Sequence, residues 1–150
     1  MAQEGSIETL VLDLEGTLIL NAANPVRRPG LFSFLEFCRS RFPRVVVFTA
    51  VEAGEFRQVA TEMVETGDAP SWFVDVEHYC WDYRLSRYKD LRAIEGAVVG
   101  RTVIVDDAWQ VVDPEQRQQW VEIVPMNEAM PGTDGELTRL TVVLGRLAKR

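Results

Sequence analysis

Polar side chains directly follow three of the most apolar segments of the sequence. These side chains are Asp13, Thr49 and the adjacent pair Asp106 and Asp107. A single aspartate in such a place is often a turn former or a helix cap. Three carboxylates and a hydroxyl at three segment ends instead indicate one functional crevice, because open parallel sheets bind ligands outside the carboxyl ends of their strands.

Phosphoryl transfer is the chemistry that suits this set of groups. Neighbouring carboxylates repel one another unless a metal or a proton relieves the repulsion, and Mg²⁺ takes one or two carboxylates together with water and substrate phosphate. An ionised Asp13 beside Mg²⁺ could attack a phosphate and form an aspartyl-phosphate intermediate. Lys89 is the candidate for the cation that completes the charge balance; the alternative for Lys89 is an exposed, solvated lysine.

The remaining pattern predicts the sheet that would position these groups. Apolar segments alternate with amphipathic ones, which is typical of an α/β fold with a parallel sheet. The aromatic and basic segment 77–88 is expected to form a loop or short edge strands. Strands are expected at residues 9–12, 45–48, 72–74, 102–105 and 120–124, helices at residues 31–41, 55–66 and 136–147, and a flap at about residues 18–29.

Length and composition restrict the class of protein. The 150 residues, 47% hydrophobic and 26% charged, predict one globular domain over residues 1–150. The net charge of −7 disfavours nucleic-acid binding, which depends on Lys and Arg. Cys38 and Cys80 suit buried thiols of a reducing compartment better than a disulfide framework, and no segment has the length and hydrophobicity of a membrane span. We therefore expect a cytoplasmic protein without membrane contact, and the sequence leaves its oligomeric state open.

The same residues lie in motifs that resemble those of the haloacid dehalogenase (HAD) superfamily. The sequence DLEGT at residues 13–17 resembles the first motif, Thr49 the second, Lys89 the third, and the Asp106 and Asp107 pair the fourth. The carboxyl-terminal-domain phosphatase branch, also called the NLI-interacting-factor (NIF) family, is closer still. Its motifs are matched by RPG at residues 28–30, VVFTA at 46–50, KDL at 89–91 and VIVDD at 103–107.

The resemblance implies a fold and a role for each matching residue. The fold would be a HAD-like Rossmannoid α/β/α sandwich with a mainly parallel five-stranded sheet and no large cap domain. Asp13 would be the nucleophile, and Glu15 would be the general acid and base. Thr49 and Ala50 would bind the phosphoryl oxygens, which Lys89 would neutralise.

A magnesium site and a class of substrate are also implied. Asp13 and the main-chain carbonyl of Glu15 would bind Mg²⁺ together with Asp107, while Asp106 would support Asp107 or orient Lys89. The implied substrate is a phosphorylated protein or a small phosphoester. Dehalogenation, another reaction of the superfamily, is disfavoured because it needs no metal and takes place in a capped apolar pocket.

Glu15 departs from the pattern, because the family has aspartate at this position. Glutamate has a similar unperturbed pKa, but its extra methylene displaces the carboxylate by roughly 1–1.5 Å, and such a misplacement can slow a reaction about a hundredfold. Two functions therefore follow: a phosphatase, or a catalytically impaired relative that serves as a binding module. Among the tryptophans, Trp109 is expected to lie nearest the site, since it follows Asp107 by two residues.

Overall fold

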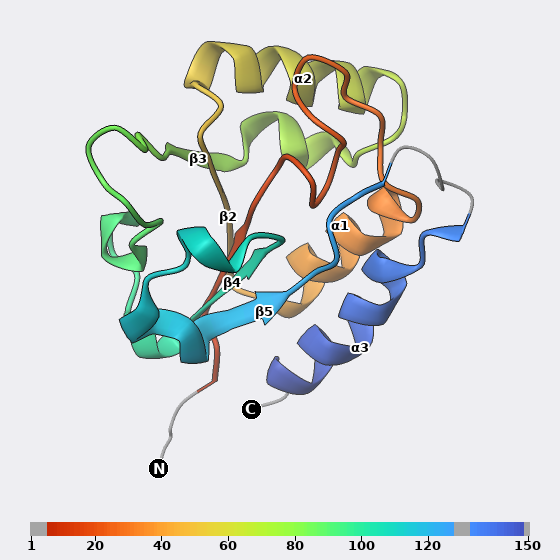
Figure 1. The fold of residues 1–150 in the computed structure, drawn as a ribbon. Helices are drawn as coiled ribbons and strands as arrows, with labels where there is room; N and C mark the ends of the chain where they lie inside the picture. The colour runs from red at the N-terminus through yellow and green to blue at the C-terminus, as the bar shows by residue number, and fades with distance from the viewer. Residues whose placement is uncertain (1–5, 128–132, 149–150) are drawn as a thin grey trace.

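Five parallel strands form the central sheet of the protein. The computed structural model describes residues 6–127 and 133–148. The strand order is β3-β2-β1-β4-β5, so the first strand lies in the middle of the sheet. The strands are β1 (Thr9–Leu12), β2 (Arg44–Thr49), β3 (Glu77–Cys80), β4 (Thr102–Asp106) and β5 (Trp120–Glu122), and the helices are α1 (Leu31–Arg41), α2 (Ala53–Glu65) and α3 (Glu136–Leu147) (Figure 1).

Successive side chains of the central strands are buried on opposite faces of the sheet. On β1, Leu10 and Leu12 belong to one core cluster, whereas Val11 belongs to the other. This alternation follows from the pleat of a strand, and burial of both faces explains the continuous apolar segments. The α/β sandwich that the sequence predicts is thereby confirmed.

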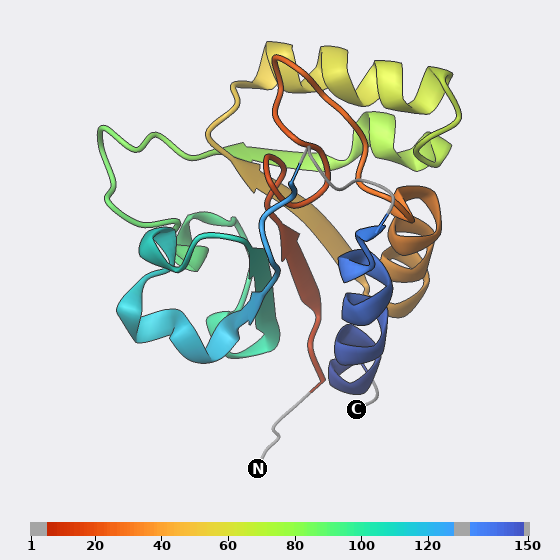
Figure 2. The same cartoon turned by 45° about the vertical axis from the view of Figure 1, so that its right-hand side comes forward.

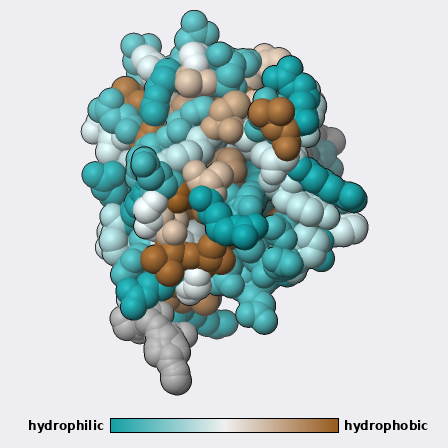
Figure 3. Space-filling view, turned by 90° about the vertical axis from the view of Figure 1, so that its left-hand side faces the viewer, coloured by the Kyte–Doolittle hydropathy of each residue, from teal (hydrophilic) through white to brown (hydrophobic). Residues whose placement is uncertain are grey.

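The two faces of the sheet are covered by different kinds of structure. All three α-helices cover one face (Figure 2), and their buried side chains are Leu31, Phe34, Leu35, Cys38, Phe56, Val59, Ala60, Met63, Leu137, Leu140 and Leu144. The other face is covered by short 3-10 helices, and Leu91 of the helix Leu91–Ala93 and Ile94, which follows this helix, contribute to the core. The outer surface on this side of the sheet is mainly hydrophilic, with small separate apolar patches (Figure 3).

The third strand lies elsewhere than the apolar pattern predicts. Residues 72–74 are part of a 3-10 helix, Ser71–Asp75, in which Phe73 packs edge-to-face against Phe56 of α2. The strand is β3, inside the segment expected to form a loop or short edge strands, and among the described strands it pairs with β2 alone. An edge strand needs no continuous apolar segment, so β3 carries only weak sequence signals.

The other predicted elements differ from the structure only at their ends. Helix α2 begins at Ala53, two residues earlier than predicted, because the Glu52 side chain accepts a hydrogen bond from the Glu55 N–H and caps the helix. Strand β5 ends at Glu122, two residues earlier than predicted. Among the described residues, no helix combines the length and hydrophobicity required to cross a membrane.

Residues 18–28 form a hairpin between β1 and α1, which we call the hairpin segment. Its main chain is joined by hydrogen bonds from the Leu20 N–H to the Val26 carbonyl (2.9 Å) and from the Arg28 N–H to the Leu18 carbonyl (3.0 Å). Leu18 and Ile19 are buried, whereas Asn24 at the tip is exposed. The hairpin segment is therefore anchored at its base, and its tip lies near α2 (Figures 1 and 2).

Candidate functional site

Asp13 lies at the carboxyl end of the central strand. β1 is flanked by β2 and β4, and the chain crosses to opposite sides of β1 to form these two neighbours, so Asp13 lies at the topological switch point. The Asp13 N–H donates to the Val105 carbonyl (3.0 Å), and the residue is only 5% exposed. The sheet itself therefore holds this carboxylate in a fixed place.

Lys89 reaches the same point from the segment that follows β3. Its Nζ lies 2.8 Å from Asp13 Oδ1 and 2.7 Å from Asp106 Oδ2. Burial lowers the pKa of Lys89, but the charges of Asp13 and Asp106 outweigh burial and raise it above the ordinary value. The ammonium is therefore charged, and it bridges two buried carboxylates.

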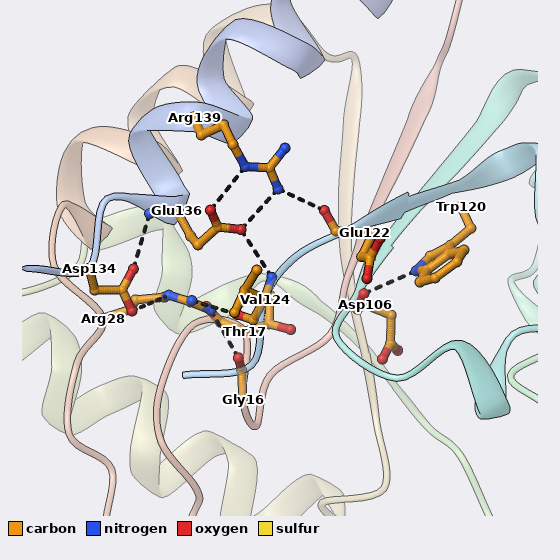
Figure 4. A network of polar contacts seen from close by, with 10 residues as sticks. All are labelled: Gly16, Thr17, Arg28, Asp106, Trp120, Glu122, Val124, Asp134, Glu136 and Arg139. Atoms are coloured by element: carbon orange, nitrogen blue, oxygen red, sulfur yellow. Dashed lines mark hydrogen bonds and ion pairs between the residues drawn. The ribbon is translucent and has the colours of Figure 1, made fainter. Parts of the chain in front are cut away.

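Asp106, the last residue of β4, and Asp107, which follows it, complete an acidic cluster. Asp106 Oδ1 accepts a hydrogen bond from the Ala108 N–H (3.0 Å), and the Asp106 carbonyl accepts one from Trp120 Nε1 (3.0 Å; Figure 4). Burial, and then the charge of Asp13, raise the pKa of both carboxyl groups, that of Asp107 to about 7. Protonation of Asp107 near neutrality is thus one way to relieve the repulsion within this group.

A bound divalent cation is a second way to relieve the repulsion, and the carboxylate oxygens of the cluster are suited to bind one. One oxygen from each of Asp13, Asp106 and Asp107 can be chosen so that all three lie within 4.8 Å of one another. Lys89 supplies a single positive charge against these three carboxylates, so a net negative charge is left at the site. Carboxylate oxygens are ligands that Mg²⁺ accepts. We refer to Asp13, Lys89, Asp106 and Asp107 as the acid–lysine cluster.

The turn after β1 is shaped around this cluster. Thr17 Oγ1 donates to Asp13 Oδ2 at 2.8 Å, and both side chains are buried. Gly16 has φ +81°, and a Cβ atom at this position would lie 2.3 Å from Asp107 Oδ2. Glycine is therefore required here both for the left-handed backbone and for the space occupied by Asp107.

The residues predicted from the sequence surround one hollow of about 170 Å³. Thr49 and Ala50 come from the end of β2, and Thr49 Oγ1 accepts a hydrogen bond from the Val51 N–H (3.2 Å). Such a hollow has room for a phosphate group and for groups that contact it. Its lining consists of Asp13, Glu15, Thr49, Ala50, Trp81, Lys89, Asp106, Asp107, Ala108 and Val111.

Glu15 belongs to the lining of the hollow but is bound to the hairpin segment. Its Oε2 accepts a hydrogen bond from the Ala22 N–H at 2.8 Å. Glu15 and Ala50 also line a neighbouring hollow of about 550 Å³, between the hairpin segment and the start of α2. The Glu15 carboxylate thus lies at the boundary between the two hollows.

Trp81 is the tryptophan that lines the first hollow, so the expectation for Trp109 is wrong. The Trp81 ring centroid lies 5.8 Å from Lys89 Nζ, whereas Trp109 is 54% exposed and packs against the guanidinium of Arg117. Trp81 directly follows β3, the strand that the apolar pattern does not locate. Thr17, which binds Asp13, was not predicted as a site residue. Its place in the DLEGT motif is a sequence signal that could have identified it.

A comparison with protein families agrees with the geometry of the site. A search among curated proteins found no match. The family model for NLI interacting factor-like phosphatase matches residues 8–150. This match includes the whole sheet, the three α-helices and the acid–lysine cluster, so the chain belongs to the NLI interacting factor-like phosphatase family.

Proposed function

We propose that the protein is a Mg²⁺-dependent phosphatase of the HAD type that hydrolyses a phosphomonoester. The observation that carries this proposal is the Asp13 carboxylate, which faces a hollow and lies 2.8 Å from the buried ammonium of Lys89. A carboxylate with a fixed position and a cationic neighbour suits attack on a phosphorus atom. Membership of a phosphatase family supports the same reaction.

The acid–lysine cluster would also hold the metal. Asp13, Asp106 and Asp107 would supply side-chain oxygens, and Glu15 would supply its main-chain carbonyl. The bound Mg²⁺ would neutralise charge on the phosphoryl oxygens during transfer. Lys89 would remain beside Asp13 and add a second positive charge, while Thr49 and the N–H of Ala50 would orient the phosphoryl group.

Two steps would complete the hydrolysis. In the first, Asp13 Oδ attacks phosphorus, the bond to the leaving oxygen breaks, and Glu15 donates a proton to that oxygen. In the second, Glu15 takes a proton from water, the water oxygen bonds to phosphorus, and the bond to Asp13 breaks. Asp13 is thereby regenerated, and inorganic phosphate leaves.

The neighbouring hollow favours a substrate larger than phosphate itself. It adjoins the site at Glu15 and Ala50 and lies between the hairpin segment and α2. We propose a phosphorylated protein segment or a small phosphoester as substrate, with the hairpin segment as a flap of a single domain. Cys38 is buried, as expected, whereas Cys80 is exposed, so the expectation of a buried thiol is wrong for Cys80. Both are free thiols, which suits a cytoplasmic location.

A catalytically impaired binding module is the second candidate function. The observation that favours it is the hydrogen bond from the Ala22 N–H to Glu15, which ties the general acid to the hairpin segment. In this case the acid–lysine cluster would bind phosphate without turning it over.

Hydrolysis of an aryl phosphate, with and without Mg²⁺, separates the two functions. We expect turnover by the wild type only with Mg²⁺, and a loss of at least about 10⁴-fold in Asp13→Asn, which removes the nucleophile. A silent wild type together with an active Glu15→Asp variant would identify the natural protein as an impaired relative. If no variant turns over and calorimetry detects no Mg²⁺ binding, the site assignment fails.

A further inference from the structure

Arg28 is a charged side chain that lies almost wholly inside the protein, with 1% of its surface exposed. It comes directly before Pro29 and Gly30, at the end of the hairpin segment. A buried guanidinium is stable only when its N–H groups have partners. The identity of the partners therefore shows what the burial of Arg28 achieves.

Two of the partners belong to the turn that follows Asp13. Arg28 Nη1 donates to the Gly16 carbonyl at 3.0 Å and to the Thr17 carbonyl at 3.3 Å. The Gly16 carbonyl also accepts the Met126 N–H at 2.9 Å. The main chain of this turn is thus held by hydrogen bonds from Arg28 (Figure 4) and from the Met126 N–H.

The remaining partners belong to the segment between β5 and α3. Arg28 Nη2 donates to the Val124 carbonyl, and Arg28 Nε donates to Asp134 Oδ2 at 2.9 Å. Asp134 is itself held, because its Oδ1 accepts the Glu136 N–H at the start of α3 (3.0 Å). Arg28 therefore joins the turn after β1 to the beginning of α3.

The turn transmits this constraint to Asp13. Thr17 Oγ1 donates to Asp13 Oδ2 at 2.8 Å, so the position of the Thr17 main chain influences the position of the carboxylate. On the basis of the function proposed above, we propose that Arg28 is a positioning residue that fixes the Asp13 carboxylate through Gly16 and Thr17, with Asp134 holding Arg28 in place.

The test compares one substitution at two arginines of the same network. Arg28→Lys keeps the charge but cannot reproduce the planar set of donors. Arg139→Lys is the matched control, because Arg139 binds Glu136 and the Glu122 carbonyl and its contacts do not include the turn (Figure 4). We expect a tenfold to hundredfold lower kcat in Arg28→Lys, roughly the effect of a misplacement near 1 Å, with KM within about twofold. Arg139→Lys should keep the wild-type kcat.

Amide hydrogen exchange provides a readout that does not depend on turnover. The N–H groups of Thr17 and Leu18 donate to the Leu14 carbonyl within the turn, and their exchange should be about tenfold faster in Arg28→Lys than in either the wild type or Arg139→Lys. An unchanged kcat per folded molecule, or unchanged exchange in the turn, would overturn the proposal. If the wild type has no phosphatase activity, the proposed function fails, and exchange alone still decides whether Arg28 holds the turn.

Asp134→Asn continues the test if Arg28→Lys does not fold. Asparagine keeps the oxygen that caps α3 but removes the charge beside Arg28 Nε. We expect a smaller decrease in kcat, about threefold to tenfold, with KM unchanged, because Arg28 keeps its carbonyl partners. A wild-type kcat and wild-type exchange in this variant would also contradict the proposal.

Discussion

The two sides of the hollow differ in how they hold their functional groups. On the sheet side, Asp13 and Asp106 end adjacent strands, and Lys89 bridges their carboxylates at 2.8 and 2.7 Å. On the other side, Glu15 is half-buried, and its carboxylate is bound to a main-chain N–H of the hairpin segment. The first set of groups is fixed by the core, whereas Glu15 is fixed by a loop.

This difference indicates a division of labour. Groups fixed by the core suit nucleophilic attack and charge neutralisation, which require constant geometry. A carboxylate on a loop can follow the substrate and the leaving group, and loops are the parts of a fold with the lowest local stability. Changes on the sheet side should therefore affect stability and activity together, whereas changes at Glu15 should affect activity alone.

Removal of the lysine charge should have the largest effect. Lys89→Met leaves Asp13 and Asp106 buried without their cation, and we expect the free energy of unfolding to fall by about 3–5 kcal/mol, with loss of turnover. Mg²⁺ should raise the melting temperature of this variant more than that of the wild type, since it replaces the missing charge. Urea denaturation measures the first effect, and thermal melting with and without Mg²⁺ measures the second.

Arg101→Met is the control for this prediction, because it removes the cation of an exposed ion pair with Glu8. Its effect on the free energy of unfolding should stay within about 0.5 kcal/mol. Equal losses of stability in Lys89→Met and Arg101→Met would contradict the distinction between the two sides of the hollow.

Glu15→Gln should have the next largest effect, and on rate rather than stability. The amide oxygen of glutamine can still accept the Ala22 N–H, but the side chain can no longer transfer a proton. We expect turnover of an aryl phosphate to fall by about 10²–10⁴, while the free energy of unfolding changes by less than about 1 kcal/mol. Retention of wild-type turnover would exclude Glu15 as the general acid and base.

A pair of glycine substitutions measures the crowding in the acid–lysine cluster, and the difference between the two variants should be the smallest of the predicted effects. Gly16 and Gly67 have nearly the same φ, +81° and +80°. The atoms nearest to a Cβ at Gly16 belong to Asp107, whereas no described atom lies within 4 Å of a Cβ at Gly67. Gly67→Ala should cost about 1–2 kcal/mol of stability from the backbone alone. Gly16→Ala should cost a further 1–3 kcal/mol or so, because Asp107 must move.

Calorimetry should show weaker Mg²⁺ binding in Gly16→Ala and unchanged binding in Gly67→Ala. Identical stability and identical Mg²⁺ binding in the two variants would mean that Asp107 moves freely. In that case the sheet side of the hollow would be less rigid than the structure indicates.

The sequence by itself determined the parts of this protein that depend on local pattern. Strands buried on both faces appear as continuous apolar segments, so β1, β2 and β4 were predictable. The residues at their carboxyl ends, Asp13 and Thr49 among them, were predictable as neighbours because strands of a parallel sheet end at the same edge.

Only the tertiary structure decided the features that depend on contacts between distant segments. β3 is an edge strand with weak sequence signals, so the sequence left residues 77–88 open between a loop and short edge strands, and the place of Trp81 could not be predicted. The contacts of Arg28 with Gly16, Val124 and Asp134 join positions up to 106 residues apart, and no local pattern encodes them. The RPG motif marked Arg28 as part of the family pattern, but its partners follow from the packing of the chain around the turn after Asp13.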